Sequence, residues 1–249
     1  MNTERESGEQ DDAEKLMRDL LCACLLGDLE ASDPEVMTVT KCVEEKKVCV
    51  RVECEKGEMA LHKLARFKVT DKNKATYEKV FNMIIAANRE QATAAGKSGI
   101  QGDINHQDKA GKTPLYQAIE CKNMKMMGLL YGLGAEGPDS LLVNSVGWTV
   151  MHSAVNTDDL ETIKKLVEHF TPARTKLLLA TPDKSGREPL HIAAYKCTED
   201  AVQYLISIGA KNARSDAAGN TAAKLAERAG RRRSRDIIED PESAKAAGS

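Results

Sequence analysis

Three histidines, His62, His152 and His191, are the first residues of this chain that could carry chemistry. Imidazole titrates near neutral pH and is the commonest metal ligand in proteins. Each histidine, however, follows a Leu or a Met in a similar four-residue segment, and at least 39 residues separate them. Ligands of one zinc ion must converge on it at about 2 Å. The recurrence therefore favours a repeated structural role over a shared metal site or a catalytic site.

Two Gly-Lys segments, at 96–98 and 111–113, are similar to the end of a phosphate-binding loop. Such a loop needs another glycine five positions before its Gly-Lys pair, so that the backbone can cradle the phosphates. Gln91 and His106 occupy those two positions. Neither segment lies between an expected strand and an expected helix, so we predict no nucleotide site and no cofactor.

Hydrolytic motifs are also missing from the sequence. It contains no Gly-x-Ser-x-Gly turn and no spaced nucleophile–base pair. The paired carboxylates Asp158–Asp159 and Glu199–Asp200 stand where the second helix of a helical pair is expected to begin. There they interact favourably with the positive end of the helix dipole. We predict no catalytic residue, no metal ligand and no enzymatic activity.

The elements that would position these residues are repeated. A glycine recurs at positions 57, 111, 147, 186 and 219, with spacings of 54, 36, 39 and 33 residues. Two residues after each glycine comes a variant of one segment: Met59–His62, Thr113–Tyr116, Thr149–His152, Glu188–His191 and Thr221–Lys224. A threonine at the first position can cap the following helix, so the helix starts at Met59 and Glu188 are expected to be weaker. The uneven spacings indicate repeats that carry insertions.

The 33 residues that begin at Asp183 show the repeat most clearly. They open with an Asp-x-x-Gly turn, enter a helix at Pro189, break at 197–200, and continue in a second helix that ends at Gly209. The Pro-Leu-His-Ile-Ala-Ala segment and the 33-residue period resemble the ankyrin repeat. The resemblance covers about Cys54–Ile238. It implies an all-α repeat solenoid of stacked helix-turn-helix units joined by hairpin-like finger loops, with the histidines bonded to backbone between neighbouring repeats.

The repeats suggest four segments in the chain. We expect a disordered acidic tail at 1–12, a degenerate N-terminal capping repeat at 13–53, an ankyrin array at 54–238 and a disordered tail at 239–249. A period-two run at 48–53 indicates an extended finger at the end of the capping repeat. Counting the capping repeat as the first, the others begin as follows: the second at Cys54, the third at Asp108, the fourth at Asn144, the fifth at Asp183 and the sixth at Asp216.

Insertions lie in the second and fourth repeats. The second is expected to have an inner helix near 60–66 and an outer helix near 75–87. The segment 89–102 is rich in Ala, Gly and Ser and is expected to form a mobile loop. In the fourth repeat, residues 171–180 lengthen the connection to the next finger.

The second helix of the sixth repeat is unusually basic, with the sequence Arg-Arg-Arg-Ser-Arg at 231–235. We favour a solvated face of a terminal repeat, because such a repeat has only one neighbour. The alternative is a nuclear-import or nucleic-acid patch, but aromatic residues for base stacking are absent. Arginines at −3 and −2 also make Ser234 a candidate for arginine-directed kinases, although an unmodified, solvated serine is the favoured interpretation.

Composition bounds the environment of the chain. Seven cysteines form no Cys-x-x-Cys pair, which is typical of reduced, buried thiols in an intracellular protein. No run approaches the roughly 20 apolar residues that span a membrane, so we expect no membrane partner. Residues 1–60 hold 16 acidic and 8 basic residues, whereas the remainder holds 22 acidic and 28 basic ones. We predict a cytoplasmic protein that is a monomer on its own, with nuclear entry left open.

In the ankyrin family the partner binds to the finger tips and to the exposed side of each first helix. The resemblance implies that matching positions here include Ser145, Val146 and Trp148 in the fourth repeat. Trp148 and Tyr195 are large residues at positions that packing is not expected to need, as interface anchors often are. The residues predicted to bind a partner are Lys109, Lys112, Trp148, Lys184, Arg187, Tyr195 and Lys196. Because most of them are basic, we expect a protein partner with an acidic patch.

The resulting prediction is a non-catalytic ankyrin-repeat scaffold or adaptor that binds a protein partner. Two alternatives stay open. The chain could be a regulatory or inhibitory subunit of an enzyme or transcription factor, whose acidic N-terminal part contacts a basic partner. It could also be the docking segment of a larger enzyme or channel.

Overall fold

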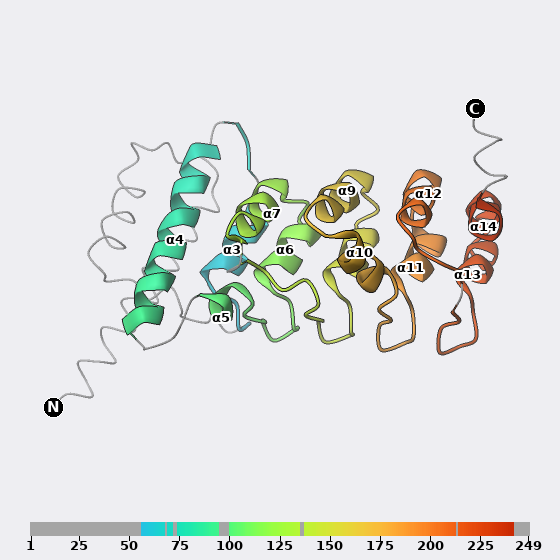
Figure 1. The fold of residues 1–249 in the computed structure, drawn as a ribbon, viewed down its shortest axis with the longest axis horizontal. Coiled ribbons are helices and arrows are strands. Elements are labelled where there is room, and N and C mark those ends of the chain that lie inside the picture. The colour runs from blue at the N-terminus through green and yellow to red at the C-terminus, as the bar shows by residue number, and fades with distance from the viewer. Residues whose placement is uncertain are drawn as a thin grey trace. The chain divides into compact units, whose positions relative to one another are not determined.

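The computed structural model describes residues 56–67, 69–71, 74–94, 100–134, 137–212 and 214–241. Within these ranges every regular element is a helix (Figure 1). The chain forms two compact units, Met1–Asp139 and Ser140–Ser249, called here the N-terminal and C-terminal units. The expected tail, capping repeat and period-two run before residue 56 lie outside the described residues, as do residues 242–249.

The N-terminal unit contains the second and third repeats. Its helices are α3 (Ala60–Arg66), α4 (Lys74–Ala94), α5 (Gln101–Ile104), α6 (Pro114–Glu120) and α7 (Met124–Tyr131). α3 packs against α4 and α6, and α6 packs against α7. Each repeat thus pairs an inner helix with an outer one, and the inner helix expected near 60–66 is confirmed.

The C-terminal unit contains the fourth, fifth and sixth repeats. Its helices are α8 (Val150–Asn156), α9 (Leu160–Glu168), α10 (Pro172–Leu179), α11 (Pro189–Lys196), α12 (Glu199–Ser207), α13 (Ala222–Arg228) and α14 (Arg232–Glu239). α11 lies between α8 and α13 in an inner row, and α12 packs on α14 in an outer row. The loops before α8, α11 and α13 project from the same side of the helices (Figure 1). Stacked helix-turn-helix repeats, as the sequence predicts, account for this unit.

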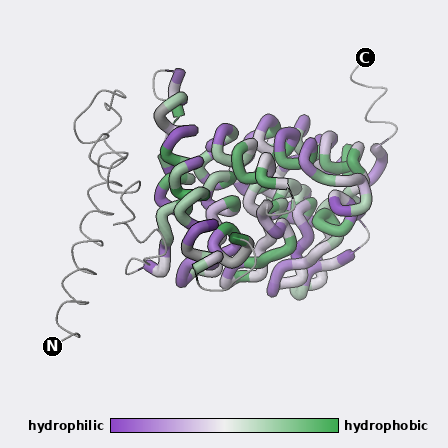
Figure 2. The backbone as a smooth tube through the Cα atoms, turned by 60° about the vertical axis from the view of Figure 1, so that its left-hand side comes forward, coloured by the Kyte–Doolittle hydropathy of each residue, from purple (hydrophilic) through white to green (hydrophobic). Residues whose placement is uncertain are grey.

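Short helices of this kind depend on their caps and on one buried face. Thr113 Oγ1 accepts a hydrogen bond from Tyr116 N (3.2 Å), and Thr221 Oγ1 accepts one from Lys224 N (3.3 Å). Along each helix hydrophilic and hydrophobic residues alternate (Figure 2), and the hydrophobic ones form the core. Ala, Leu and Ile side chains dominate that core, which explains how the chain folds with few aromatic residues. Two slim helices per repeat leave little space for larger side chains.

The expectation of weaker helix starts at Met59 and Glu188 stays a prediction, but it took no account of the histidines that follow these two residues. Their backbone N–H groups donate to Nδ1 of His62 (3.2 Å) and His191 (3.1 Å), three residues further along. Thr149 N donates to Nδ1 of its own histidine in the same way (3.2 Å). The histidine therefore satisfies the orphan donor at the helix start, whatever residue occupies the cap.

Both insertions contain helix that the sequence interpretation missed. The prediction of a loop over 89–102 is wrong at both ends of the segment, because α4 continues to Ala94 and α5 occupies Gln101–Ile104. Arg, Glu, Gln and Ala are good helix formers, and buried Ala92 extends the apolar face of α4. Residues 171–180 form α10, whose first turn is capped by Thr171 Oγ1, an acceptor for Arg174 N (3.2 Å).

The finger loops share one hydrogen-bonding scheme. In the four fingers at 108–112, 144–148, 183–187 and 216–220, a single Asp or Asn Oδ1 accepts two backbone N–H groups at 2.8–3.0 Å, which folds the tip into a fixed turn. The acceptors are Asp108, Asn144, Asp183 and Asp216, and the donors lie two and four residues after each.

Neighbouring fingers are joined through their backbones. In the N-terminal unit Lys109 N donates to Lys56 O (3.0 Å). In the C-terminal unit Lys184 N donates to Val146 O (3.2 Å) and Ala217 N donates to Ser185 O (2.9 Å). The fingers within a unit therefore form a row held by main-chain contacts, which leaves their tip side chains available.

The recurring glycine belongs to this contact. Gly147 has φ +86°, and a Cβ there would lie 2.7 Å from Lys184 N, which is too close for two non-bonded atoms. A Cβ on Gly186 (φ +74°) would lie 3.0 Å from Ala217 N. Gly219 (φ +75°) has the same backbone conformation, but nothing lies within 4 Å of its added Cβ. Positive φ and close approach can therefore be separated experimentally.

We expect Gly147→Ala to destabilise the protein more than Gly219→Ala, with Gly186→Ala between them. All three variants place alanine at positive φ, which costs about 1–3 kcal/mol. Only the first two also push a neighbouring finger away and weaken its backbone hydrogen bond. The free energy of unfolding in urea measures the difference. Equal losses in all three variants would show that the contact between fingers contributes nothing.

Candidate protein-binding surface

Two of the three histidines connect neighbouring repeats, as the resemblance implies, whereas Nε2 of His191 has no hydrogen-bond partner among the described residues. His62 Nε2 lies 2.9 Å from Lys112 O in the next repeat, and His152 Nε2 lies 3.0 Å from Arg187 O. Because Nδ1 of each ring accepts from a backbone N–H, the neutral ring carries its proton on Nε2 and donates it to the carbonyl. Both side chains are completely buried. These two histidines are structural bridges and do not belong to one site.

Burial keeps the bridging histidines neutral. It lowers the pKa of His152 to about 4, against an opposing effect of the bond to Arg187 O. Burial likewise lowers the pKa of His62. A proton added to Nδ1 would also face the donor N–H at the helix start, so the charged ring does not fit its place.

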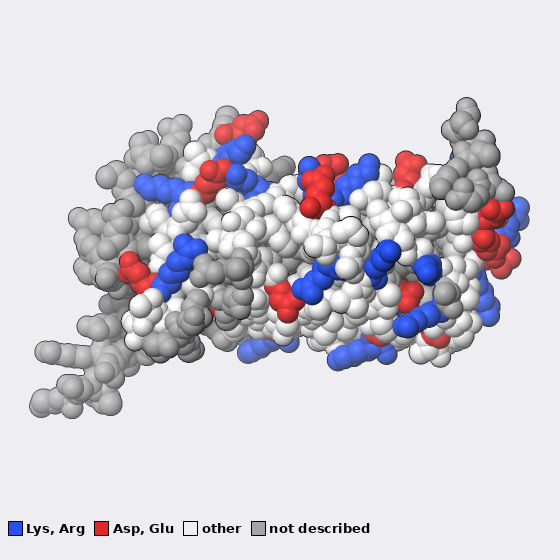
Figure 3. Space-filling model, viewed as in Figure 1, with Lys and Arg blue, Asp and Glu red and all other residues white. Residues whose placement is uncertain are grey.

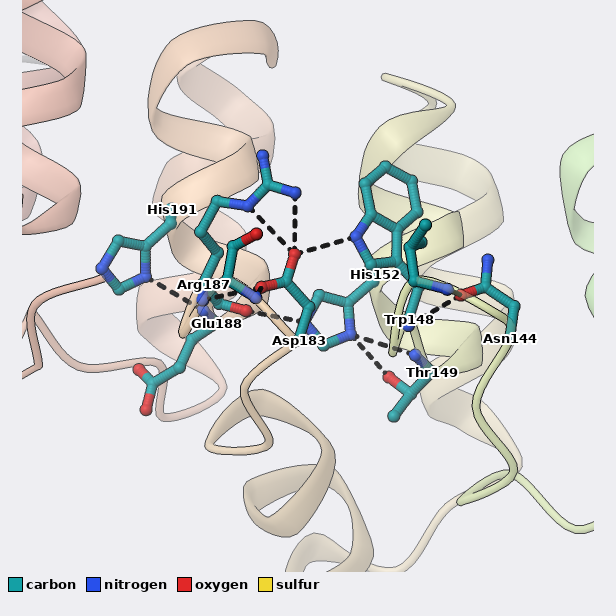
Figure 4. A network of polar contacts seen from close by, with 10 residues as sticks. Asn144, Trp148, Thr149, His152, Asp183, Arg187, Glu188 and His191 are labelled. Atoms are coloured by element: carbon teal, nitrogen blue, oxygen red, sulfur yellow. Dashed lines mark hydrogen bonds and ion pairs between the residues drawn. The ribbon is translucent and has the colours of Figure 1, made fainter. Parts of the chain in front are cut away.

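A polar network surrounds His152 in the C-terminal unit (Figure 4). Trp148 Nε1 donates to Asp183 Oδ2 (3.0 Å), and its ring stacks on the imidazole of His152 with centroids 6.3 Å apart. Arg187 Nε and Nη2 donate to the same Oδ2 at 3.0 and 2.8 Å. Burial alone would raise the pKa of Asp183, but hydrogen bonds from Arg187, Trp148 and Ser185 outweigh it and lower that pKa.

This network corrects the argument for two predicted binding residues. Trp148 does contribute to packing: it is half-buried, and its indole N–H donates to the buried carboxylate of Asp183. Arg187 neutralises the same carboxylate. Both side chains therefore serve the junction between the fourth and fifth repeats first, and only their outer edges are left for a partner.

The predicted lysines differ in how far they are engaged. Lys112 Nζ pairs with Glu120 (2.6 Å) and lies 5.6 Å from the ring centroid of Tyr116. Lys196 Nζ donates to Asn156 O and Oδ1 at 2.5 and 2.8 Å. Lys184 Nζ reaches only the exposed carbonyl of Ser145 (2.6 Å). Lys109, in the N-terminal unit, is exposed at its finger tip.

Two apolar side chains are exposed on the same elements. Tyr195, at the end of α11, is 38% exposed, in agreement with its predicted role as a surface residue. Val146, at the tip of the fourth finger, is 50% exposed, although it was not among the seven chosen residues. Its place next to Gly147 in the turn could have marked it, because a tip residue cannot pack into its own repeat. Both occupy positions of the implied binding surface.

Comparison with known families agrees with this geometry. Residues 83–176 match a model described as ankyrin repeats (3 copies), and residues 151–206 match one described as ankyrin repeats (many copies). The chain is an ankyrin-repeat protein. No curated protein matched its sequence. Ankyrin repeats are generally protein-interaction modules and typically have no catalytic role.

The ankyrin fold also uses the motifs that first suggested chemistry. Gly111 lies in the finger turn, Lys112 N donates to Asp108 Oδ1, and Thr113 caps α6, so the second Gly-Lys segment forms no phosphate cradle. The first Gly-Lys segment, at 96–98, lies outside the described residues. Among the residues that the structure describes, no three His, Cys, Asp or Glu side chains are placed to hold a metal ion. No helix among them is long and apolar enough to cross a membrane.

The cysteine expectation holds for one of the two described thiols. Cys197 is buried, its Sγ donates to Val155 O (3.1 Å), and burial raises the pKa of its thiol to about 12. Cys121 is exposed, which contradicts the expected burial. It is the C-cap of α6, on the open end of an inner helix. The other five cysteines lie outside the described residues.

In the basic segment of the sixth ankyrin repeat, Arg231 makes part-buried contacts, whereas Arg232 and Arg233 are exposed as the sequence predicts. Arg231 donates to the carbonyl oxygens of Lys196 and Cys197 at the end of α11. Arg233 pairs with Glu199 (3.0 Å), and Arg235 pairs with Asp236 (2.6 Å). Acidic and basic side chains adjoin at the edge formed by α14 (Figure 3). A solvated serine among them is not observed: Ser234 is 1% exposed.

Acid should destabilise the protein through His152. The folded-state pKa of about 4 lies below the ordinary 6.5, so the unfolded chain takes up this proton first as the pH falls. The stability that neutral His152 contributes is complete above pH about 6.5 and is lost as the pH falls through about 4, a change on the order of 3 kcal/mol. Urea unfolding of wild type and His152→Gln between pH 7 and 4.5 measures it.

Wild type should lose more stability over that range than His152→Gln, which has no titrating ring at this position. His169→Gln is the comparison: burial also lowers the pKa of His169, but this residue is exposed at the end of α9, so its loss should change the pH dependence less than His152→Gln does. An unchanged pH dependence in His152→Gln would show that the bridge is not a titrating element of the fold.

Proposed function

We propose that this ankyrin-repeat protein is a non-catalytic adaptor that binds a protein partner through the finger tips and inner-helix ends of its C-terminal unit. The observation that carries the proposal is a row of fingers joined by main-chain hydrogen bonds, with exposed side chains at their tips. Main-chain bonds hold the row, yet Val146 and Tyr195 remain exposed beside Lys184 and Lys196. A surface already fixed before binding loses little entropy when a partner docks.

The residue roles follow from the contacts. Val146 and Tyr195 supply apolar area, and aromatic residues are frequent energetic centres of interfaces. Lys184 supplies a charge that is bound only to an exposed carbonyl. Trp148 and Arg187 shape the surface from below, since both are bonded to Asp183. In the N-terminal unit Lys109 and Lys112 occupy the corresponding finger positions.

The expected partner is a protein segment with acidic and apolar side chains. Lys184 and Lys196 add positive charge, whereas the nearby carboxylate of Asp183 is buried and neutralised by Arg187. A complementary partner would be drawn to this side by long-range attraction, which acts chiefly on the association rate.

Affinity capture from a native lysate, followed by protein identification, tests the surface. Proteins retained by wild type should be lost with Val146→Asp and Tyr195→Ala. Leu177→Asp is the matched control, because Leu177 is equally exposed (49%) but lies on α10 and not on a finger or inner helix. Retention of the same proteins by all variants, or loss only with Leu177→Asp, would overturn the proposed surface.

Charge reversal tests the acidic character of the partner. With the captured partner, Lys184→Glu should slow association several-fold and flatten its salt dependence between roughly 50 and 300 mM. Lys176→Glu on α10 should leave both unchanged. Arg187 is unsuitable for reversal because its loss would leave Asp183 buried and unpaired. Association that responds equally to both variants would exclude steering by the fingers.

A further inference from the structure

Ser234 lies on α14 with its side chain turned into the C-terminal unit. It is 1% exposed, and its Oγ has no hydrogen-bond partner in the described part of the chain. A buried hydroxyl without a partner is unfavourable, and an alanine would fill nearly the same space. Packing therefore gives no reason for a serine at this position.

Two other buried polar atoms without partners occur around the same repeat. They are His191 Nε2 and Asn220 Oδ1. His191 is the counterpart of His152, but its Nε2 makes no bond of the kind that His152 Nε2 makes to the next repeat. Within the described residues of the C-terminal unit, these two atoms and Ser234 Oγ are the buried side-chain N and O atoms that have no hydrogen-bond partner. All three belong to the sixth repeat or to the residue that would bridge to it.

Because the unpartnered atoms gather there, we expect the unit to open first at the sixth repeat. Opening α14 gives water to Ser234 Oγ, although it also breaks the bonds that Arg231 donates to the end of α11. Arg231 holds α14 at the end of α11, while Arg233 and Arg235 pair with Glu199 and Glu227 across solvent-exposed contacts. Exposed ion pairs contribute little. Elements held by few strong contacts are also those that open locally.

We propose that Ser234 is a cryptic phosphorylation site for an arginine-directed serine/threonine kinase, reached when α14 opens. The arginines at −3, −2, −1 and +1 match the acidic substrate grooves of such kinases. The kinase transfers the γ-phosphoryl group of ATP: the bond from Pγ to the bridging oxygen breaks and the bond from Ser234 Oγ to Pγ forms. A carboxylate of the kinase takes the hydroxyl proton, and ADP leaves.

Phosphorylation holds α14 open. A phosphoserine carries a charge of about −1.5 to −2, which cannot return to a position that is 1% exposed without a charged partner inside. The neighbouring arginines can pair with the phosphate in the open state, and Arg231 then no longer supports the end of α11. The buried side chains Ile237 and Ile238 become exposed at the same time.

The first test compares phosphorylation of the full chain with that of a peptide spanning residues 228–241. Both are incubated with an arginine-directed kinase and MgATP, and mass spectrometry follows Ser234. The peptide should react at least tenfold faster, because every copy is open. Glu199→Gln with Glu227→Gln should raise the rate of the full chain several-fold, since it removes pairs of α14 without altering the kinase recognition segment.

Glu161→Gln on α9 is the control and should react like wild type. An unreactive peptide would remove the kinase motif from consideration. A full chain that reacts as fast as the peptide, or that gains nothing from the double variant, would show that α14 does not gate the site.

Amide hydrogen exchange of Ser234→Glu and Ser234→Ala tests the consequence. Amides of α14 should exchange at least tenfold faster in Ser234→Glu than in wild type, while α8 and α9 keep their protection. Ser234→Ala should be protected at least as well as wild type, because it only removes the unpartnered hydroxyl. Equal protection of α14 in the two variants would overturn the proposal.

Discussion

The side-chain oxygen of the Asp or Asn in the finger turn is the interaction on which the contacts between neighbouring repeats depend. One Oδ1 of Asp or Asn binds two backbone N–H groups and thereby fixes the turn. With the turn fixed, the next finger can lie close enough for a backbone hydrogen bond, and the carbonyl after the glycine faces the preceding repeat. In two junctions that carbonyl, at Lys112 and at Arg187, receives the histidine bridge. The turn, the glycine and the histidine therefore act together to join neighbouring repeats.

This arrangement explains why short helices with a core of small aliphatic side chains are stable. Seven- to nine-residue helices are marginal in isolation, so packing against neighbouring repeats must stabilise them. Nδ1 of the histidine accepts the backbone N–H at the start of the inner helix, and Nε2 donates to a carbonyl of the next repeat. The neutral, buried ring is what allows both bonds, which is why acid acts on the junction and not on the surface.

Sequence reasoning found what is periodic and local. The glycine spacing and the Pro-Leu-His segments predicted the inner helices, including α3 and α11, and the stacked architecture. It missed α10, although Thr171 followed by proline is a helix-start signature, because the segment was interpreted only as added length. It also misjudged Trp148, whose partner Asp183 is 35 residues away in the chain. No spacing reveals such a pair before the repeats are stacked.

The residues that build a finger differ from those that a partner would contact, so the ankyrin fold itself says little about the partner. In each finger the turn oxygen and the glycine are required by the backbone, and the residue after the glycine contributes its main chain. At the tip, the side chain of Val146 has none of these roles, and that of Lys184 adds one hydrogen bond to Ser145 O in the neighbouring finger. Their chemistry must then be explained by something outside the chain. Ser234 is the converse: it is buried, unpartnered and unexplained by packing, so its meaning also has to come from outside the fold.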